Sequence, residues 1–227
     1  MTPTQTPAPT TRHESQRTRD FILANTKLLT PPLVPEIKLH LAEESLPIWQ
    51  KTEDELGQIN VPPPYWAFAW AGGQALARYI LDNQELIQGR TVLDLGSGSG
   101  LTAIAAMMAG ASSVLAADID IFALASVHLN AAENGMSVTT TSDDLLAAAP
   151  GRHGVILVGD LFYERLLAEK VTAFIEAARA GGALVLIGDP QRNYFPKGRF
   201  KRVAEYRVPV TRELEDADFK TAAVWRI

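Results

Sequence analysis

The sequence predicts an α/β fold in which a mostly parallel sheet, covered by helices on both faces, ends in an antiparallel hairpin. Between residues 91 and 188, short apolar runs alternate with helical segments, a pattern typical of parallel strands buried on both faces. A glycine-rich turn follows the first of these strands. Two strand-like segments at the C-terminus have only a polar linker between them, so they should pair antiparallel. Together these observations indicate a Rossmann-like sheet of seven strands.

Each element of this sheet has a local signal. Continuous apolar runs mark the strands, and segments with helical periodicity mark the helices. Gly135 and the Gly181-Gly182 pair end two helices, because glycine adopts the left-handed conformation that closes a helix. We expect strands at Thr91–Leu95, Ser113–Ala117, Val138–Thr141, Val155–Gly159, Ala183–Gly188, Arg202–Pro209 and Phe219–Arg226, and helices at Trp70–Asp82, Leu101–Ala109, Ile121–Asn134, Leu145–Ala149 and Glu164–Ala180.

The chain divides into three segments. Residues 1–13 are rich in Thr and Pro and are predicted to form a disordered tail. Residues 14–60 are predicted to form an N-terminal helical extension, with an amphipathic helix over Glu14–Leu29 and a short strand over Ile37–Leu41. Residues 61–227 are expected to form the main domain, which opens with a run of prolines that must be extended.

The composition excludes several classes of protein. The 227 residues, 47% hydrophobic and 21% charged, suit one soluble domain with an extension. A net charge of −5 gives no basic field for nucleic acid, and no apolar run is long enough to span a membrane. The lack of cysteine excludes disulfides and thiolate chemistry, and the four histidines show no metal-binding spacing. We therefore expect no metal, no nucleic acid and no membrane partner.

The strongest chemical signal is the turn Asp94–Gly100, between the first strand of the sheet and a helix. Gly96, Gly98 and Gly100 let the backbone approach a ligand closely. In a dinucleotide-binding domain such a turn holds a pyrophosphate, but a carboxylate from Asp94 at its lip would repel phosphate and accept hydrogen bonds from an ammonium group. S-adenosyl-L-methionine has an α-ammonium and no phosphate, so the order of residues favours this cofactor over NAD. The alternative is a tight turn without a ligand.

Further acids follow the next two strands. Asp118 ends the second strand, where a carboxylate can accept hydrogen bonds from both ribose hydroxyls of either cofactor. Asp120 is the alternative, although its position at the start of a helix suits an N-cap. Asp143 and Asp144 follow the third strand; Asp143 is the preferred contact for the adenine amino group, and the alternative for the pair is a helix cap.

Aromatic residues and a fourth acid are candidates for the reacting end of the site. Trp66 and Trp70 precede the sheet, and an aromatic wall can attract a sulfonium cation; the alternative for Trp66 is a buried staple, and both roles can hold. Asp160 and Tyr163 follow the fourth strand, beside the first, so we expect them to hold the acceptor. The alternative for Tyr163, and for its neighbour Phe162, is packing.

A basic cluster, Lys197–Arg202, follows the fifth strand. Its loop is expected to project from the ligand-binding edge and to dock an acidic protein partner. The alternative is a solvated loop.

Several of these motifs together resemble one family, the lysine methyltransferases of the electron transfer flavoprotein β subunit, which are class I (seven-β-strand) S-adenosylmethionine-dependent enzymes. The resemblance covers roughly Glu36 to Ile227. The ribosomal-protein methyltransferases are similar mainly in Asp94–Gly100 and Asp118–Asn130. The motifs shared with the first family are Pro63-Pro64-Tyr65-Trp66, Gly72-Gly73-Gln74-Ala75-Leu76, Asp160-Leu161-Phe162-Tyr163 and Gly188-Asp189-Pro190 with Arg192 and Tyr194.

The resemblance implies methyl transfer to lysine ε-amino groups of a protein, with the electron transfer flavoprotein β subunit, or in bacteria also a ribosomal protein, as substrate. It implies that Asp94, Gly96, Gly98 and Asp118 bind the donor and that Asp160 and Tyr163 lie at the acceptor. We expect a monomer in a bacterial cytoplasm. The competing hypotheses are a small-molecule N-methyltransferase, an NAD-dependent oxidoreductase and a catalytically silent binding module.

Overall fold

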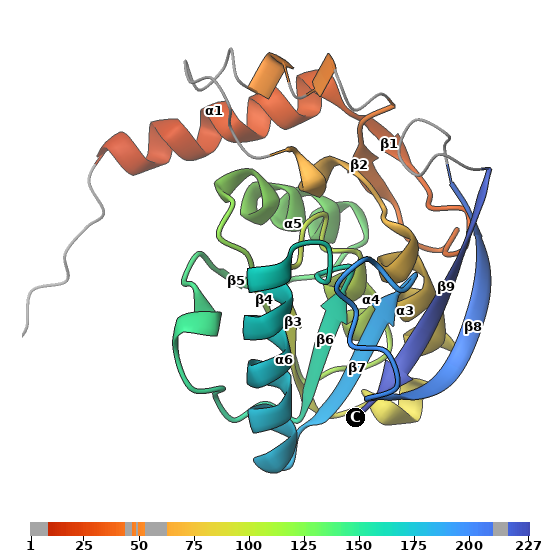
Figure 1. The fold of residues 1–227 in the computed structure, drawn as a ribbon. Coiled ribbons are helices and arrows are strands. Elements are labelled where there is room, and N and C mark those ends of the chain that lie inside the picture. Colours follow the sequence, from red (N-terminus) through yellow and green to blue (C-terminus); the bar gives the residue numbers. More distant parts are fainter. Residues whose placement is uncertain (1–8, 44–46, 49, 53–62, 211–217) are drawn as a thin grey trace, which may run out of the picture.

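The computed structural model describes residues 9–43, 47–48, 50–52, 63–210 and 218–227. Its centre is a seven-stranded sheet in the order β5-β4-β3-β6-β7-β9-β8 (Figure 1). The strands are β3 (Thr91–Leu95), β4 (Ser113–Ala117), β5 (Thr139–Thr141), β6 (Val155–Gly159), β7 (Leu184–Asp189), β8 (Lys201–Pro209) and β9 (Phe219–Arg226).

The strand directions confirm the predicted sheet. β3 lies in the middle of the parallel strands, with β4 and then β5 on one side and β6 and then β7 on the other. β9 runs antiparallel to both β7 and β8. The carboxyl ends of the parallel strands therefore meet at one edge, called the C-terminal edge below, which is where ligands bind in open α/β sheets.

Helices cover both faces, as predicted. Val92 of β3 packs with α3, α4 and α5 in one core cluster, and the next residue, Leu93, packs with α6 in another. This alternation is the two-residue period of a strand buried on both faces. The helices are α3 (Ala71–Asp82), α4 (Leu101–Met108), α5 (Ile121–Glu133) and α6 (Arg165–Ala180), and the short 3-10 helices are η1 (Tyr65–Ala67), η2 (Gln84–Leu86) and η3 (Leu145–Ala147).

The N-terminal segment corrects one prediction. Helix α1 runs over Pro9–Asn25, so it begins within the predicted tail and ends before Leu29. The side chains of Asn25 and Thr26 donate to the carbonyls of the preceding turn, at 2.8 and 2.6 Å. Residues Lys27–Leu29 then form β1, which pairs antiparallel with β2 (Leu39–Leu41). The expected strand at Ile37–Leu41 is thus present in shorter form.

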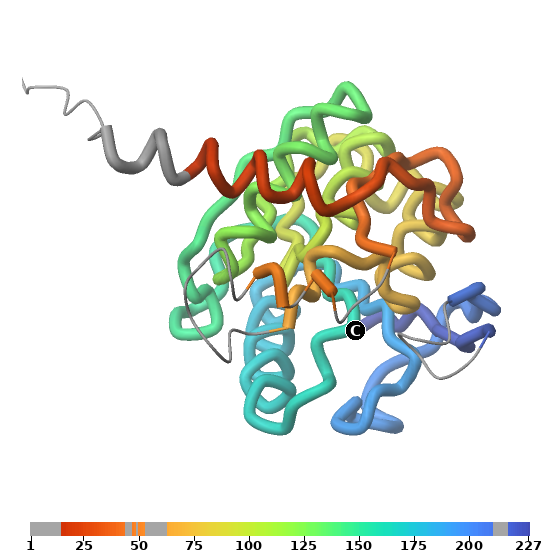
Figure 2. The backbone as a smooth tube through the Cα atoms, turned by 90° about the horizontal axis from the view of Figure 1, so that it is seen from above, coloured from red at the N-terminus to blue at the C-terminus, as the bar shows by residue number. Residues whose placement is uncertain are grey.

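Helix α1 lies across the C-terminal edge of the sheet and packs against α5 (Figure 2). The rings of Phe21 in α1 and Phe122 in α5 meet edge to face at 5.4 Å between centroids. The ring of Trp66 also stacks on that of Phe122, with 5.7 Å between their centroids. The extension is therefore joined to the domain by an aromatic cluster. No helix in the described ranges is both long and apolar enough to cross a membrane.

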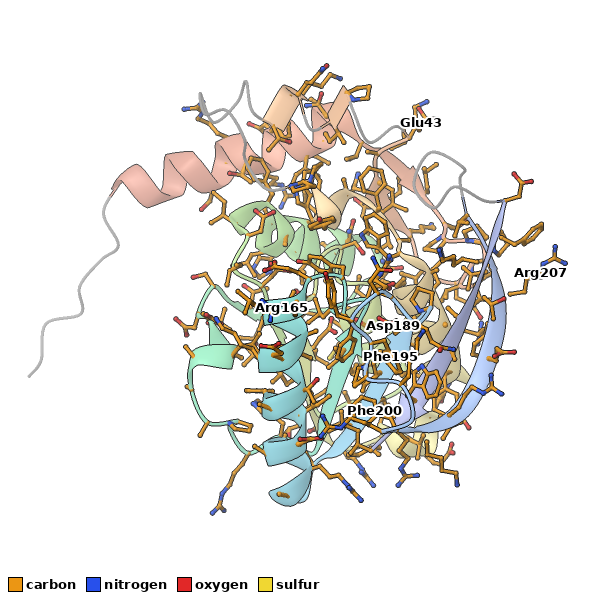
Figure 3. The ribbon with its side chains drawn as sticks, viewed as in Figure 1. Glu43, Arg165, Asp189, Phe195, Phe200 and Arg207 are labelled. Atoms are coloured by element: carbon orange, nitrogen blue, oxygen red, sulfur yellow. The ribbon has the colours of Figure 1, made fainter. Side chains whose placement is uncertain are left out.

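The basic cluster lies elsewhere than expected. β7 ends at Asp189 at the C-terminal edge, but β8 begins at Lys201 opposite Arg226, which also faces Leu186 in the middle of β7. The intervening loop therefore descends along the α6 face, where Phe195 and Phe200 are buried (Figure 3). The guanidinium of Arg199 pairs with Glu176 in α6 at 2.5 Å. Most of the cluster thus lies away from the ligand-binding edge. The reason is that β8 begins opposite the end of β9, which is level with the middle of β7 and not with its C-terminal end.

Candidate active site

The glycine turn lies at the C-terminal edge, between β3 and α4. The amides of Gly96 and Ser97 donate to the carbonyl of Ala117, which ends β4, at 2.8 and 3.1 Å. Gly96, Gly98 and Gly100 all have positive φ angles, of 65°, 50° and 80°, a conformation that strains other residues. A Cβ on Gly96 would lie 2.6 Å from the side chain of Leu161 in the loop after β6. The predicted turn is therefore present, and the loop after β6 lies against it.

Asp94 is buried beneath this turn instead of lining its lip. The side chain is only 1% exposed, and its Oδ1 accepts a hydrogen bond of 2.7 Å from the hydroxyl of Thr102. Burial raises the pKa of Asp94 to about 7, and the negative charge of Asp118 adds to the effect. Its Oδ2 is buried without a hydrogen-bond partner in the described part of the chain. The expected carboxylate at the lip is thus corrected, since Thr102 in α4 holds the group inside.

Asp118 contacts the glycine turn directly. Its Oδ2 accepts from the amide of Gly98 at 2.9 Å, and its Oδ1 accepts from the amide of Asp120 at 3.0 Å. Burial raises the pKa of Asp118. Asp120 caps α5 by accepting from the amide of Phe122 at 2.8 Å, which is the cap role considered for it. Asp118 is therefore the acid that lies beside the turn.

Asp143 lies at the rim of the same edge. Its carboxylate accepts from the hydroxyl of Thr141 at 2.8 Å and is exposed. The amide of Asp118 donates to the carbonyl of Thr141 at 3.2 Å, so the end of β5 lies beside Asp118. Asp144 caps η3 through the amide of Leu146. The structure brings Asp143 close to the site, and its contact with adenine stays a prediction.

Asp160 directly follows β6, in a strained conformation that its neighbours hold in place. Its φ of 58° lies in the left-handed region, which costs free energy for a residue other than glycine. One carboxylate oxygen, Oδ2, accepts from the amide of Gly73 in the first turn of α3 at 2.7 Å. The other, Oδ1, accepts from Nε and Nη2 of Arg192 at 3.0 and 2.8 Å. With both oxygens engaged, Asp160 is suited to fixing a position more than to removing a proton.

Arg192 and Asp189 were missed as site residues. The motif that contains them contributed to the family resemblance, but its residues had no assigned role. The amide of Arg192 donates to Oδ1 of Asp189 at 2.7 Å, which places the arginine above the end of β7. Asp189 is fully buried, and burial together with the nearby Asp160 raises its pKa to about 7. Figure 3 shows Asp189 where β7 meets this loop.

The first turn of α3 packs against β7 through backbone alone. A Cβ on Gly72 would lie 2.3 Å from the carbonyl oxygen of Gly188, and a Cβ on Gly188 would lie 2.1 Å from the carbonyl oxygen of Gly72. Any side chain at either position would force the two elements apart. This close approach brings the amide of Gly73 within reach of Asp160.

The aromatic residues divide into an inner and an outer set. Trp66 is 1% exposed and stacks on Phe122, so its ring has the predicted staple role, and its contact with the cofactor stays a prediction. Phe162 is fully buried against Phe195, which confirms packing for that residue. Tyr65 and Tyr163 instead face outward, each 40% exposed, with ring centroids 5.2 Å apart.

These residues fit a cationic nucleoside ligand. Asp94, Asp118 and Asp120 lie at or under the glycine turn. Burial raises the pKa of each, and repulsion from the negative charge of Asp118 adds to this effect at Asp94 and Asp120. A pyrophosphate would meet the same repulsion, whereas an ammonium or sulfonium group would relieve it. The positive φ angles of the turn leave space beside Gly98, where the nearest atom to an added Cβ would be the Cα of Trp66 at 3.9 Å.

Comparison with known proteins identifies the class of protein to which this fold belongs. Residues 74–185 match the family model "Ribosomal protein L11 methyltransferase (PrmA)". The fold aligns with magnesium protoporphyrin IX methyltransferase from Synechocystis at a TM-score of 0.50 and 18% identity, covering 68% of this chain and 80% of the other. The sheet order and the acid-flanked glycine turn define a class I S-adenosylmethionine-dependent methyltransferase.

The class can be narrowed to one family. The electron transfer flavoprotein beta subunit lysine methyltransferase of Rattus norvegicus is 37% identical over 212 residues, which are 90% of this chain and 82% of the relative. The Caenorhabditis elegans homolog is 34% identical over 233 residues, covering 91% and 94%. The chain belongs to the electron transfer flavoprotein beta subunit lysine methyltransferase family.

Proposed function

We propose that this protein transfers methyl groups from S-adenosylmethionine to lysine ε-amino groups of the electron transfer flavoprotein β subunit. The similarity to the lysine methyltransferases extends over nine-tenths of the chain. The structural observation that carries the proposal is the Asp160–Tyr163 loop, which is anchored by Arg192 and Gly73 and lies against the glycine turn through Leu161. This arrangement supports the proposal, because it would bring the donor and the acceptor together at one point of the sheet edge.

The bound donor supplies a methyl group on a sulfonium, an electrophile that a neutral amine can attack in line. A free lysine has a pKa of about 10.4, so it must lose a proton before it reacts. Loss of water from around the lysine as the protein substrate docks lowers that pKa. Asp160, held by three hydrogen bonds from protein groups, orients the acceptor end of the site. In this proposal most of the rate enhancement comes from proximity and alignment.

The test is transfer of labelled methyl groups to the purified β subunit, followed by mass spectrometry of the modified lysines. Asp160→Ala should abolish turnover while S-adenosylhomocysteine still binds, as measured by calorimetry. Glu176→Ala, on the exposed surface of α6, serves as the control and should leave turnover unchanged. Near-normal turnover of Asp160→Ala would remove Asp160 from the mechanism, and no labelling of the β subunit by the wild-type protein would refute the proposed substrate.

One observation favours a second substrate class. The family model of the ribosomal protein L11 methyltransferases matches residues 74–185, which run from α3 to β7 and include the whole glycine turn. That range leaves out the β8–β9 hairpin and the N-terminal extension. A parallel assay with the ribosomal protein and with small free amines separates these alternatives.

We also propose that the enzyme acts as a monomer in a bacterial cytoplasm, without nucleic acid or a membrane as partner. Light scattering of the purified protein and fractionation of cells that express it test the two statements.

A further inference from the structure

Two outward-facing tyrosines come together from distant parts of the chain. Tyr65 begins η1, and Tyr163 follows the Asp160 loop, yet their rings lie 5.2 Å apart with a tilt of 46° between planes. Each is 40% exposed, whereas the residues next to them, Trp66 and Phe162, are buried. The backbone thus turns one aromatic ring inward and its neighbour outward at both places. We call Tyr65 and Tyr163 the tyrosine pair.

The tyrosine pair flanks the glycine turn. On one side, the Cα of Trp66, next to Tyr65, is the nearest atom to a Cβ built on Gly98. On the other side, Leu161, two residues before Tyr163, is the nearest contact for a Cβ built on Gly96. The two segments that carry the pair therefore both border the glycine turn. Their exposed rings, in contact with each other, form an aromatic surface that is joined to the turn by one or two residues of chain on each side.

The chemistry of the pair suits a cation. Burial raises the pKa of Tyr65, and burial together with Tyr65 and Glu164 raises the pKa of Tyr163 to about 12, so both phenols are neutral at physiological pH. Neutral aromatic faces attract ammonium and methylammonium groups. The exposed carboxylate of Glu164, next to Tyr163, adds negative potential at the same place, and the guanidinium of Arg192, which lies over Trp70, opposes it.

The nearby Trp70 has a different function. Its ring lies 5.3 Å below the guanidinium of Arg192, so a cation of the protein already covers it. Its Nε1 donates to the carbonyl of Tyr65 at 2.9 Å, which fixes the backbone that presents Tyr65. Trp70 thus holds the backbone of Tyr65 in place, while the rings of the tyrosine pair stay exposed.

We propose that Tyr65 is a specificity-determining residue that, with Tyr163, forms an aromatic wall for the lysine ammonium and its methylated products. The lysine chain would lie along the two rings while the ε-amino group points to the glycine turn. This inference deepens the proposed function and rests on it for the identity of the acceptor. It differs from a packing role because it depends on the charge of the bound group and on the ring, not on the hydroxyl.

The first test uses a pair of probes that differ only in charge. Choline and its uncharged carbon analogue, 3,3-dimethyl-1-butanol, are titrated into the enzyme loaded with S-adenosylhomocysteine, and binding is followed by NMR. The wild-type protein and Tyr65→Phe should bind choline about 2- to 30-fold more tightly than the alcohol, and Tyr65→Ala should lose this preference. Phe219→Ala is the control, because Phe219 is an aromatic residue of similar exposure that lies at the outer hairpin, where the guanidinium of Arg207 covers its ring.

The second test uses the protein substrate. Tyr65→Ala should raise the KM for the β subunit by about 2- to 30-fold, with an unchanged melting temperature and unchanged affinity for S-adenosylhomocysteine, and Tyr65→Phe should restore the wild-type KM. Equal choline preference in wild type and Tyr65→Ala overturns the proposal, as does equal loss in Tyr65→Phe and Tyr65→Ala. A wild-type protein that prefers choline but does not methylate the β subunit refutes the proposed function and leaves the aromatic wall standing.

Discussion

Arg192 and Asp160 form an ion pair in which two guanidinium nitrogens contact one carboxylate oxygen, at 2.8 and 3.0 Å. Both side chains are largely buried, and the second oxygen of Asp160 accepts from the amide of Gly73. The pair joins the end of β6, the loop after β7 and the first turn of α3. The residue expected to hold the acceptor is therefore itself held by three elements.

Removing Arg192 should leave a buried carboxylate without its partner. We expect Arg192→Ala to lower the free energy of unfolding by about 3 kcal/mol and to reduce turnover. In both quantities Arg192→Lys should lie between the wild type and Arg192→Ala, because one ammonium cannot reproduce both contacts of the guanidinium. Urea unfolding and methyl transfer measure the two effects. As a control, Arg199→Ala breaks an exposed pair with Glu176 and should cost less than about 1 kcal/mol. Equal losses for Arg192→Ala and Arg199→Ala would contradict the structure.

Two adjacent glycines of α3 should respond oppositely to alanine. Gly72→Ala places a Cβ 2.3 Å from the carbonyl oxygen of Gly188 and should destabilise the protein by about 2 kcal/mol or more. Gly73→Ala meets nothing closer than 3.9 Å and should be neutral or stabilising, because alanine favours the helix. Thermal unfolding of the two variants gives the comparison. Similar melting temperatures would show that the helix can move away from β7.

The buried Asp94 should make stability depend on pH. Its pKa is about 7 in the folded protein and 3.8 as the reference value, so the folded state binds the proton more tightly. The stabilisation by protonated Asp94 is complete below about pH 4 and is lost as the pH rises to 7, with a slope of up to about 1.4 kcal/mol per unit. Asp94→Asn, which keeps an oxygen for Thr102, should gain stability relative to wild type between pH 5 and pH 8. Urea unfolding of both proteins at pH 5 and pH 8 measures this gain. If the difference in the free energy of unfolding between Asp94→Asn and the wild type is the same at both pH values, the prediction is wrong.

Asp118 and Asp143 should differ in their effect on donor binding. Asp118 accepts two backbone amides, one of them from Gly98, and charged hydrogen bonds contribute about 1.5–3 kcal/mol each. Because we expect the same carboxylate to accept hydrogen bonds from the ribose hydroxyls, Asp118→Ala should weaken S-adenosylhomocysteine binding by about 10- to 100-fold. Asp143→Ala removes one exposed acceptor and should cost about 2- to 10-fold. Calorimetry with each variant measures both, and a larger loss for Asp143→Ala would reverse the assignment.

Most of the fold could be predicted because each element carries its own local signal. The bounds of β3, β4, β6 and β9 agree with the prediction, since continuous apolar runs between turns are characteristic of buried parallel strands. The antiparallel ending followed from the short link between the last two segments. The predicted end of the first helix, Leu29, was wrong, because residues Lys27–Leu29 form a strand and pair with residues ten or more positions further along the chain.

The glycine turn could be located from the sequence, but the orientation of its neighbours could not. Asp94 was predicted at the lip and is inside, because its position depends on Thr102, a contact across the strand–helix connection. Trp66 was open to two interpretations until its stacking on Phe122 was known. The partners of Asp160 lie 87 and 32 residues away in the chain. Such long-range contacts leave no periodic trace in the sequence.

The seam between Gly72 and Gly188 bears on how enzymes of this kind diversify. A binding surface usually changes through replacement of its side chains. At this contact the backbones of α3 and β7 lie so close that neither glycine can be replaced by a larger residue without moving one element. We therefore expect differences in acceptor preference to arise at outward-facing positions such as Tyr65, where a side chain can be replaced without moving α3 away from β7.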